Sequence, residues 1–558
     1  MTDAIRYETG PDRIVVLTLD SPGQSANTMN ALYRQAMAAC VERLLAEKNS
    51  IAGVIITSAK RTFSAGCDFN ELINVDKTRA QVFYDAVLEL KTQLRALETL
   101  GKPVVAAING AALGGGWEIC LACHHRVALD QPSVQIGLPE VTFGLLPGGG
   151  GVVRMVRLLG LEKALPYLLE GQKVSARQAQ QAGLIEDLAE DREQLLAKAR
   201  TWILANPCVA QPWDVKGYRI PGGTPSDPGV ASMLAIAPSI LRNKTQGCLP
   251  APEKILCAAV EGAQVDFDIA HLIETRYFTE LATSQVAKNL MGTFWFQLNE
   301  IKAGGAHSQG LASWEIIKGA GTNEASDSVL QINETPIVLN DRPGSFSSRV
   351  LGAYTHEGIA MLGEGVSAPM IETEARKAGM RGGPLAISDE ISLSLMSHIR
   401  AQTAKDLQVE GKTPIEHPAF TVIDWLLECQ RPGKAAGGGF YEYLADGQKH
   451  LWPPLRRRFE KADGQISPQD IRDRLLFVQA LETVRCLEEG LLVSTADANV
   501  GSIFGIGFAT WTGGALQFIN QYGLRDFVAR VQYLAEQYGE RFSPPALLLE
   551  KAARQVLF

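Results

Sequence analysis

The sequence has 558 residues, of which 46% are hydrophobic and 20% are charged. This length predicts several domains rather than one hydrophobic core. The formal net charge of −8 argues against nucleic acid as the main partner, because binding to phosphates requires a basic surface. No apolar stretch reaches membrane-spanning length, and the first residues do not resemble a signal peptide. Nine scattered cysteines predict free thiols in a reducing compartment, so we expect a cytoplasmic protein.

The first hundred residues alternate between strand-like and helix-like patterns. Residues 14–19 (IVVLTL) and 51–57 (IAGVIIT) are typical of strands, and residues 30–48 have the i, i+3, i+4 apolar spacing of an amphipathic helix. Either Asn27 or Asn30 is placed to cap this helix. The order of strand, helix and strand predicts a crossover α/β fold.

The most informative stretch is residues 102–154. An apolar run typical of a buried strand (103–108) leads to three glycines (114–116) and then to an apolar, helix-like segment that contains Glu118. The first N–H groups of such a helix can stabilise an anion. A second acid, Glu140, precedes another glycine-rich turn. Two carboxyl groups and two glycine turns within about fifty residues predict acid–base chemistry beside an oxyanion hole.

Three segments of this part of the chain resemble the signature of the crotonase superfamily, specifically its enoyl-CoA hydratase branch. They are TFSAGCDFNEL (62–72), NGAALGGGWE (109–118) and GLPEVTFGLLPGGGG (137–151). Each segment alone is a weak signal, but their order and spacing together are a strong one. The resemblance implies an α/β crotonase fold, a ββα-spiral, for a domain at residues 1–290.

The resemblance also implies roles for five residues in the addition of water to an α,β-unsaturated CoA thioester. Glu118 and Glu140 would hold the water and exchange its protons. The backbone N–H groups of Cys67 and Gly115 would form the oxyanion hole, and the N–H group of Gly148 would help to position the water. This chemistry requires neither a metal ion nor a redox cofactor.

Some of these residues have a second interpretation. Glu118 in a solvated helix would be an ordinary surface acid, but its apolar neighbours favour a catalytic one. Glu140 could merely cap a helix, and the thiol of Cys67 could be a nucleophile, although the family context disfavours both. Trp117 either shapes the acyl pocket or packs in the core, and the sequence does not decide between these.

Two further groups of residues contain side chains that are able to bind a ligand. Residues 120–125 (CLACHH) contain four metal-ligand side chains, but no second pair lies at zinc spacing and the segment has the pattern of a buried helix that leads into a strand. We therefore predict no metal site. Lys60 and Arg61 are either contacts for CoA phosphates or part of a solvated turn.

The segment FWFQLNEIKAGG (294–305) resembles the linker helix between hydratase and dehydrogenase in the multifunctional α-subunit of fatty acid β-oxidation. In that family a complete NAD-binding domain follows. Here SWEIIKGAGTNEAS (313–326) already resembles the far end of that domain, and the segment from Thr335 resembles the start of the helical dehydrogenase domain. Most of the cofactor domain is therefore missing, and we do not expect NAD to bind.

No other stretch supplies a dinucleotide fingerprint. Residues 319–324 and 505–510 lack the third glycine, and residues 363–368 follow a helical pattern, which predicts a helix end. Glu315 matches the family's dehydrogenase glutamate, but His307 lacks the context of the family's histidine. Ser348 stands where the family has asparagine, so we do not expect oxidation of a substrate.

The C-terminal part contains an internal repeat at a constant spacing. Arg349, Glu357, Glu364 and Gly365 recur as Arg474, Glu482, Glu489 and Gly490, and GGPLAISD (382–389) is echoed by GGALQFIN (513–520). This predicts a linker and cofactor-domain remnant at 291–334 and two all-α, dehydrogenase C-terminal-type domains at 335–445 and 446–558.

These observations predict an enoyl-CoA hydratase of fatty acid β-oxidation that has lost dehydrogenase activity. The alternatives are a bifunctional enzyme whose NAD domain lies outside this sequence, a scaffold that docks a thiolase, and a Δ3,Δ2-enoyl-CoA isomerase. An acyl-CoA would be the substrate, and a thiolase subunit or a second copy of the chain would be the protein partner.

Overall fold

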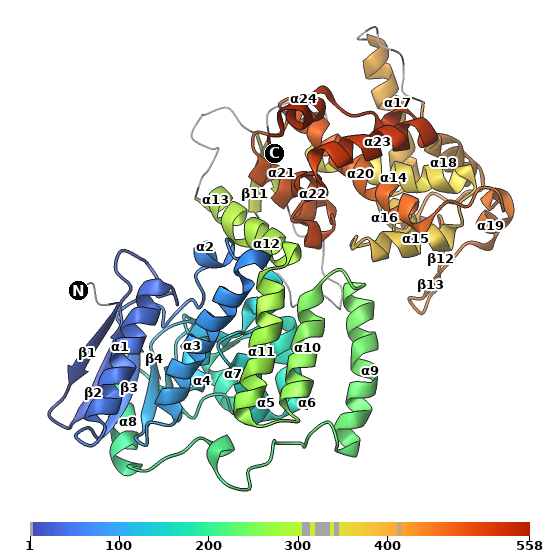
Figure 1. Cartoon of the computed structure of the whole chain (residues 1–558). Helices are drawn as coiled ribbons and strands as arrows, with labels where there is room; N and C mark the ends of the chain where they lie inside the picture. The colour runs from blue at the N-terminus through green and yellow to red at the C-terminus, as the bar shows by residue number, and fades with distance from the viewer. Residues whose placement is uncertain are drawn as a thin grey trace. The chain divides into compact units, whose positions relative to one another are not determined.

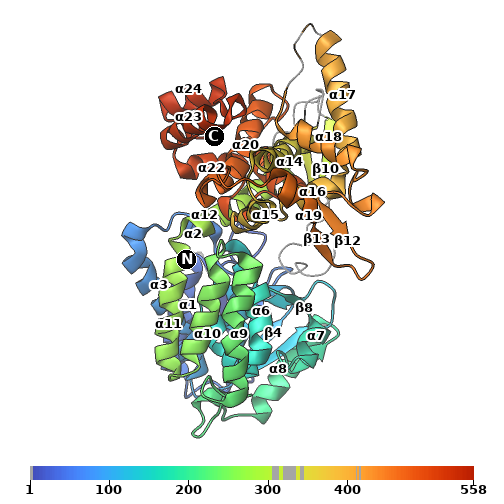
Figure 2. The same cartoon turned by 90° about the vertical axis from the view of Figure 1, so that its right-hand side faces the viewer.

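The computed structural model describes residues 4–303, 313–317, 335–339, 345–409, 411, 413 and 416–558. These residues form two compact units (Figures 1 and 2), of which the first comprises the chain up to Lys244 together with Leu249–Met291, and the second comprises Thr245–Cys248 and the described residues from Gly292 on. None of the helices in the described ranges combines the length and the hydropathy that crossing a bilayer requires.

A six-stranded sheet lies at the centre of the first unit. Its order is β1-β2-β3-β4-β6-β9, in which β1 is antiparallel to β2 and all other neighbours are parallel. The strands are β1 (Ile5–Thr9), β2 (Ile14–Leu19), β3 (Gly53–Ser58), β4 (Val104–Ile108), β6 (His125–Leu129) and β9 (Asp187–Ala189). Every residue of β3, β4 and β6 is buried, as in parallel strands that are covered on both faces. The strands predicted at 14–19, 51–57 and 103–108 are confirmed.

A small second sheet and a set of helices complete this unit. The sheet has the order β5-β7-β8, with strands β5 (Ala112–Leu113), β7 (Gln135–Gly137) and β8 (Lys173–Ser175). The helices that bear on the site are α1 (Ala31–Glu47), α3 (Ala80–Glu98), α4 (Gly115–Leu121), α5 (Gly151–Leu159), α6 (Leu161–Glu170), α8 (Arg192–Ala205), α10 (Pro250–Gly262) and α11 (Phe267–Ala282).

The two asparagines before α1 have different roles. Asn30 caps α1, because its side chain accepts from the N–H group of Tyr33. Asn27 is instead buried, and its amide donates to Ser58 Oγ and accepts from the N–H group of Ser21. The capping alternative at Asn30 is thus the correct one, and Asn27 ties the first loop to β3.

The predicted linker helix lies with the second unit. It comprises a π-helical turn (Gly292–Gln297) and α13 (Leu298–Lys302), which follow α12 (Gln285–Met291) of the first unit in the chain. The ring of Phe294 lies 5.5 Å from that of Phe504, and Thr293 Oγ1 donates to the carbonyl of Gly513 at 2.6 Å. Next in the chain, β10 (Ser313–Ile317) and β11 (Thr335–Leu339) form an antiparallel pair.

The second unit is built from helices in repeated order. α14 (Phe346–Glu364), α15 (Ala368–Lys377) and α16 (Pro384–Ile391) correspond to α20 (Pro468–Glu488), α21 (Thr495–Gly501) and α22 (Ala515–Tyr522). The remaining elements are α17 (Leu393–Val409), α18 (Ala419–Glu428), β12 (Tyr441–Tyr443), β13 (Lys449–Leu451), α19 (Pro453–Phe459), α23 (Leu524–Tyr538) and α24 (Ala546–Arg554). One continuous hydrophobic core contains residues of both copies.

The first helices of the two copies, α14 and α20, pack against each other, and their charges pair reciprocally. Each copy's arginine binds both repeated glutamates of the other copy. The pairs are Arg474 with Glu357 at 2.5 Å and Glu364 at 2.7 Å, and Arg349 with Glu482 at 2.7 Å and Glu489 at 2.5 Å. The repeated residues therefore hold the two copies together across an internal pseudo-symmetric contact.

Two of the three candidate dinucleotide motifs are helix ends. Gly365 caps α14 in the left-handed conformation with φ 114°, as predicted for residues 363–368, and Gly507 closes a π-helical turn with φ 81°. The third, at 319–324, lies outside the described residues.

Candidate active site

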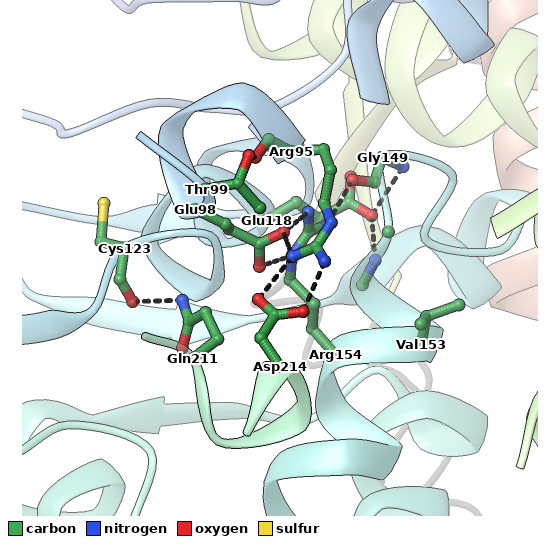
Figure 3. Close-up of polar contacts among 12 residues, drawn as sticks. Arg95, Glu98, Thr99, Glu118, Cys123, Gly149, Val153, Arg154, Gln211 and Asp214 are labelled. Atoms are coloured by element: carbon green, nitrogen blue, oxygen red, sulfur yellow. Dashed lines mark hydrogen bonds and ion pairs between the residues drawn. The ribbon is translucent and has the colours of Figure 1, made fainter. Parts of the chain in front are cut away.

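The centre of the candidate site is Glu118, in the first turn of α4 (Figure 3). The buried strands β4 and β5 lead directly into the glycines that open this helix, so the acid is placed in the core and its side chain is only 1% exposed. A carboxyl group this deeply buried requires hydrogen-bond partners. Glu118 Oε1 accepts from the N–H groups of Gly149 and Gly151, both at 2.7 Å.

Burial and charge make Glu118 a weaker acid than usual. Burial raises its pKa to about 7, and the negative charge of Glu274 acts in the same direction. The two glycine N–H groups and the ammonium group of Lys91 act in the opposite direction. A carboxyl group with a pKa near neutrality is suited to taking up and returning protons at physiological pH.

The second acid, Glu140, lies in a short helical turn (Pro139–Phe143) that is also buried. Its Oε2 has no hydrogen-bond partner within the described part of the chain. Burial raises its pKa well above the usual value, and the nearby charge of Glu118 raises it further. A buried carboxyl group with an unpaired oxygen and a raised pKa is a candidate for a functional role.

Close backbone contacts bring the two predicted oxyanion residues together. A Cβ atom on Gly66 would lie 3.0 Å from the nitrogen of Gly115, so the loop that carries Cys67 touches the start of α4. Among the described residues neither the Cys67 nor the Gly115 N–H group donates a hydrogen bond. Burial raises the pKa of the Cys67 thiol, and the charges of Glu118 and Glu140 add to this effect. The neutral thiol is a poor nucleophile, and the oxyanion role of the backbone N–H group stays a prediction.

Glycine is required at two positions by what lies beside them. Gly114 has φ 54°, and a Cβ atom there would lie 2.6 Å from Glu140 Oε1. Gly148 faces the ring of Phe278, which a Cβ atom would approach to 2.2 Å. The structure therefore places Gly148 against α11, at the start of the turn that holds Glu118. Its role in positioning water stays a prediction.

Sequence reasoning missed a set of buried charges behind the turn. Arg154 and Glu98 are both 0% exposed and form a two-pronged ion pair at 2.8 and 3.0 Å. Arg154 Nη1 also donates to the carbonyl of Gly149 (Figure 3). No local signal identifies Glu98, because a charged residue on an amphipathic helix is usually solvated.

A second missed ion pair joins Lys91 of α3 to Glu274 of α11. Lys91 Nζ lies 2.8 Å from Glu274 Oε1, with side-chain exposures of 2% and 0%. Glu274 in turn accepts from the N–H groups of Gly150 and Val153. The turn that binds Glu118 is thus held on its other side by a second carboxylate.

Other residues singled out from the sequence have structural roles. Trp117 is 1% exposed and belongs to the main core, which favours the packing interpretation.

Residues 120–125 form the end of α4 and the start of β6. The thiols of Cys120 and Cys123 donate to helix carbonyls, and the imidazole of His125 stacks on Trp202. Lys60 pairs with Asp20 at 3.2 Å. Within the described ranges, no cluster of three or more metal-ligand side chains is found.

The second unit contains a cavity of about 410 Å³ between α14, α17 and α18. Ser348, at the family's asparagine position, lines it, and its hydroxyl group bonds to that of Ser345. Glu315 lies in β10, and His307 falls outside the described residues. None of the described strands leads through a G-x-G-x-x-G turn into a helix, and the absence of NAD binding stays a prediction.

Comparison with known families agrees with the two-part architecture. Residues 9–206 match the family described as enoyl-CoA hydratase/isomerase, and residues 344–443 match that described as 3-hydroxyacyl-CoA dehydrogenase, C-terminal domain. An enoyl-CoA hydratase structure from Bacillus anthracis is 26% identical with a TM-score of 0.34, and the similarity covers 52% of this chain and 95% of that one. The DspI structure from Pseudomonas aeruginosa is 27% identical with a TM-score of 0.33, covering 43% and 95%.

Proposed function

We propose that this chain, which joins a crotonase-fold domain of the enoyl-CoA hydratase/isomerase family to a helical 3-hydroxyacyl-CoA dehydrogenase C-terminal domain, hydrates trans-2-enoyl-CoA to 3-hydroxyacyl-CoA. The observation that carries the proposal is the pair of buried acids at one site. Glu118 is held by two N–H groups and has a pKa of about 7, and Glu140 has an unpaired oxygen and a pKa raised well above its usual value.

The different hydrogen bonding of the two carboxyl groups supports a division of labour between them. Ionised Glu118 takes a proton from water as the water oxygen attacks C3 of the enoyl group. Protonated Glu140 gives its proton to C2 on the same face of the enoyl group, and the net result is syn hydration. The N–H groups of Cys67 and Gly115 stabilise the thioester oxygen while it carries enolate charge.

Two carboxyl groups favour hydration over the alternative isomerisation. Moving a double bond from C3 to C2 requires one group to remove and return a proton, whereas adding water requires a base and an acid together. The proposal therefore assigns both Glu118 and Glu140 a proton-transfer role. A scaffold with a vestigial hydratase part would have no reason to keep two buried acids with raised pKa values.

The test is to incubate the purified chain with trans-2-butenoyl-CoA and to follow the loss of the enoyl thioester absorbance, with mass analysis of the product. We expect a product heavier by one water, with no metal or nucleotide added. Conversion of 3-butenoyl-CoA to the trans-2 isomer without hydration would instead establish the isomerase, and no turnover of either compound would contradict the proposal.

The fate of the product gives a separate prediction. We expect 3-hydroxyacyl-CoA to accumulate even when NAD⁺ is supplied, and we expect NADH not to bind, because the described glycine motifs at 363–368 and 505–510 end helical segments rather than cradle phosphates. Calorimetric titration with NADH measures this, with 3-hydroxybutanoyl-CoA as the positive control for an intact protein. Saturable heat from NADH would show that a cofactor site exists.

A further inference from the structure

We propose that Lys91 and Glu274 are positioning residues for the hydration reaction: their buried ion pair holds the 149–153 turn in the shape that binds Glu118 and sets the charge beside that acid. The inference rests on the proposed function and deepens it. Glu274 contacts the turn through its carboxylate, and Lys91 contacts Glu274, so both residues act on the reaction through Glu118.

The turn itself shows why one carboxylate depends on the other. Its N–H groups are shared between two acids in near alternation: Gly149 and Gly151 donate to Glu118, whereas Gly150 and Val153 donate to Glu274 at 2.8 and 3.0 Å. A backbone segment clamped from both sides in this way cannot shift toward one acid without losing its bonds to the other. Glu274 therefore fixes the two donors that Glu118 uses.

Lys91 completes this clamp. Its Nζ contacts Glu274 Oε1 at 2.8 Å, the carbonyl of His271 at 3.0 Å and Thr275 Oγ1 at 2.7 Å. All three donor directions of the ammonium group are used, and all three partners lie on α11. The lysine thus locks α3 to the helix that carries Glu274.

A buried ion pair is weak evidence for a stabilising role, because well-packed apolar residues usually serve stability equally well. A charged pair behind a proton-transfer site also changes the pKa of the acid at that site, which apolar residues do not. Glu274 raises the pKa of Glu118 and Lys91 lowers it, so together they balance the local charge. Loss of either partner would move the pKa of Glu118 in a direction that depends on which charge is removed.

Several other charged or titratable groups lie on the elements that surround the ion pair and Glu118, and none of them is substituted in the test. Burial and the neighbouring positive charges lower the pKa of His271 well below its usual value, so it remains neutral near pH 7. The groups on each surrounding element are Glu98 on α3, Arg154 and Arg157 on α5, His271 on α11, Glu140 in its helical turn and Cys67 in the loop before α4.

The experiment measures kcat for hydration against pH in the full chain. Lys91→Met leaves the negative charge of Glu274 unbalanced, and we expect the acid limb of the profile to move to higher pH by at least about half a unit. Glu274→Gln removes that negative charge and keeps a hydrogen-bond acceptor, and we expect the limb to move to lower pH. The double variant restores neutrality, and its limb is expected to return toward that of the unchanged protein.

Matched controls separate positioning from stability. Lys163→Met removes a lysine from the exposed face of α6, and its profile is expected to match that of the unchanged protein. In all variants KM for the enoyl-CoA is expected to stay within about threefold, because neither residue binds substrate. If Lys91→Met fails to fold, Glu274→Gln and the double variant still decide the sign of the shift.

The inference is overturned if folded variants lose kcat equally at every pH while the acid limb stays in place, or if both single variants move it in the same direction. Failure of the proposed function has a different signature, since the unchanged protein would then show no hydration at all. An active protein with an unmoved limb overturns only the role of the ion pair.

Discussion

Glu118→Gln and Glu140→Gln are each expected to lower kcat for hydration by at least about 100-fold, the usual lower bound for loss of general acid–base catalysis. Glutamine keeps the volume of the side chain and an oxygen that can accept from Gly149 and Gly151, so the fold and the turn are preserved. What is lost is the transferable proton. KM is expected to change far less than kcat, because the removed interaction is made only in the transition state.

The double variant sharpens this prediction. If the two acids act on the same water and the same enolate, removing both should cost little more than removing one, as with other groups that act as a unit. Glu162→Gln is the matched control, since Glu162 lies exposed in the first turn of α6. Ordinary turnover by either single variant, with an unchanged melting temperature, would contradict the assignment of these acids.

Arg474→Met is expected to destabilise the helical unit by about 3 kcal/mol, because removing one member of a buried ion pair leaves its partner charged and uncompensated. Arg474 and Glu357 are both 0% exposed, and Arg474 also binds Glu364. Arg541 pairs with the same two glutamates, so part of the compensation remains and the lower end of the usual range applies. Hydrogen exchange of the α14 and α20 amides measures the effect locally, which avoids assuming a single unfolding transition for the whole chain.

The internal repeat offers a matched control. Arg349 is the counterpart of Arg474, but it is 23% exposed and its partner Glu489 is 47% exposed. A partly solvated ion pair stabilises the fold less than a buried one, so Arg349→Met is expected to destabilise the helical unit by about 1 kcal/mol or less. Equal losses in the two variants would show that burial does not control the strength of this reciprocal contact.

Much of the architecture could be predicted from the sequence because it depends on local patterns. The strand at 103–108, the helix end at Gly365 and the repeat in the C-terminal half all follow from apolar periodicity, glycine placement and spacing. Glu118 and Glu140 could be singled out because glycine-rich turns and apolar neighbours surround them in the chain. The division of the C-terminal half into two domains needs a qualification, since both copies share one hydrophobic core.

The charges behind the site could not be found in this way. Lys91 and Glu98 lie on a helix whose pattern is that of an ordinary amphipathic surface helix, and their burial results from α5 and α11 packing over them. A lysine pairs with a glutamate far away in sequence only when tertiary packing removes water from both, so no local spacing encodes the contact.

The sequence by itself singled out the residues that we propose to carry chemistry: two acids and two glycine turns, recognisable from their neighbours, and the loop of Cys67, recognisable from its resemblance to the crotonase family. Only the tertiary structure decided how acidic those residues are and what holds them. The pKa of Glu118 depends on burial, on two N–H groups from a turn and on charges from α3 and α11. Electrostatic energies depend on distance and on the exclusion of water, and both are properties of the packed chain rather than of its order of residues.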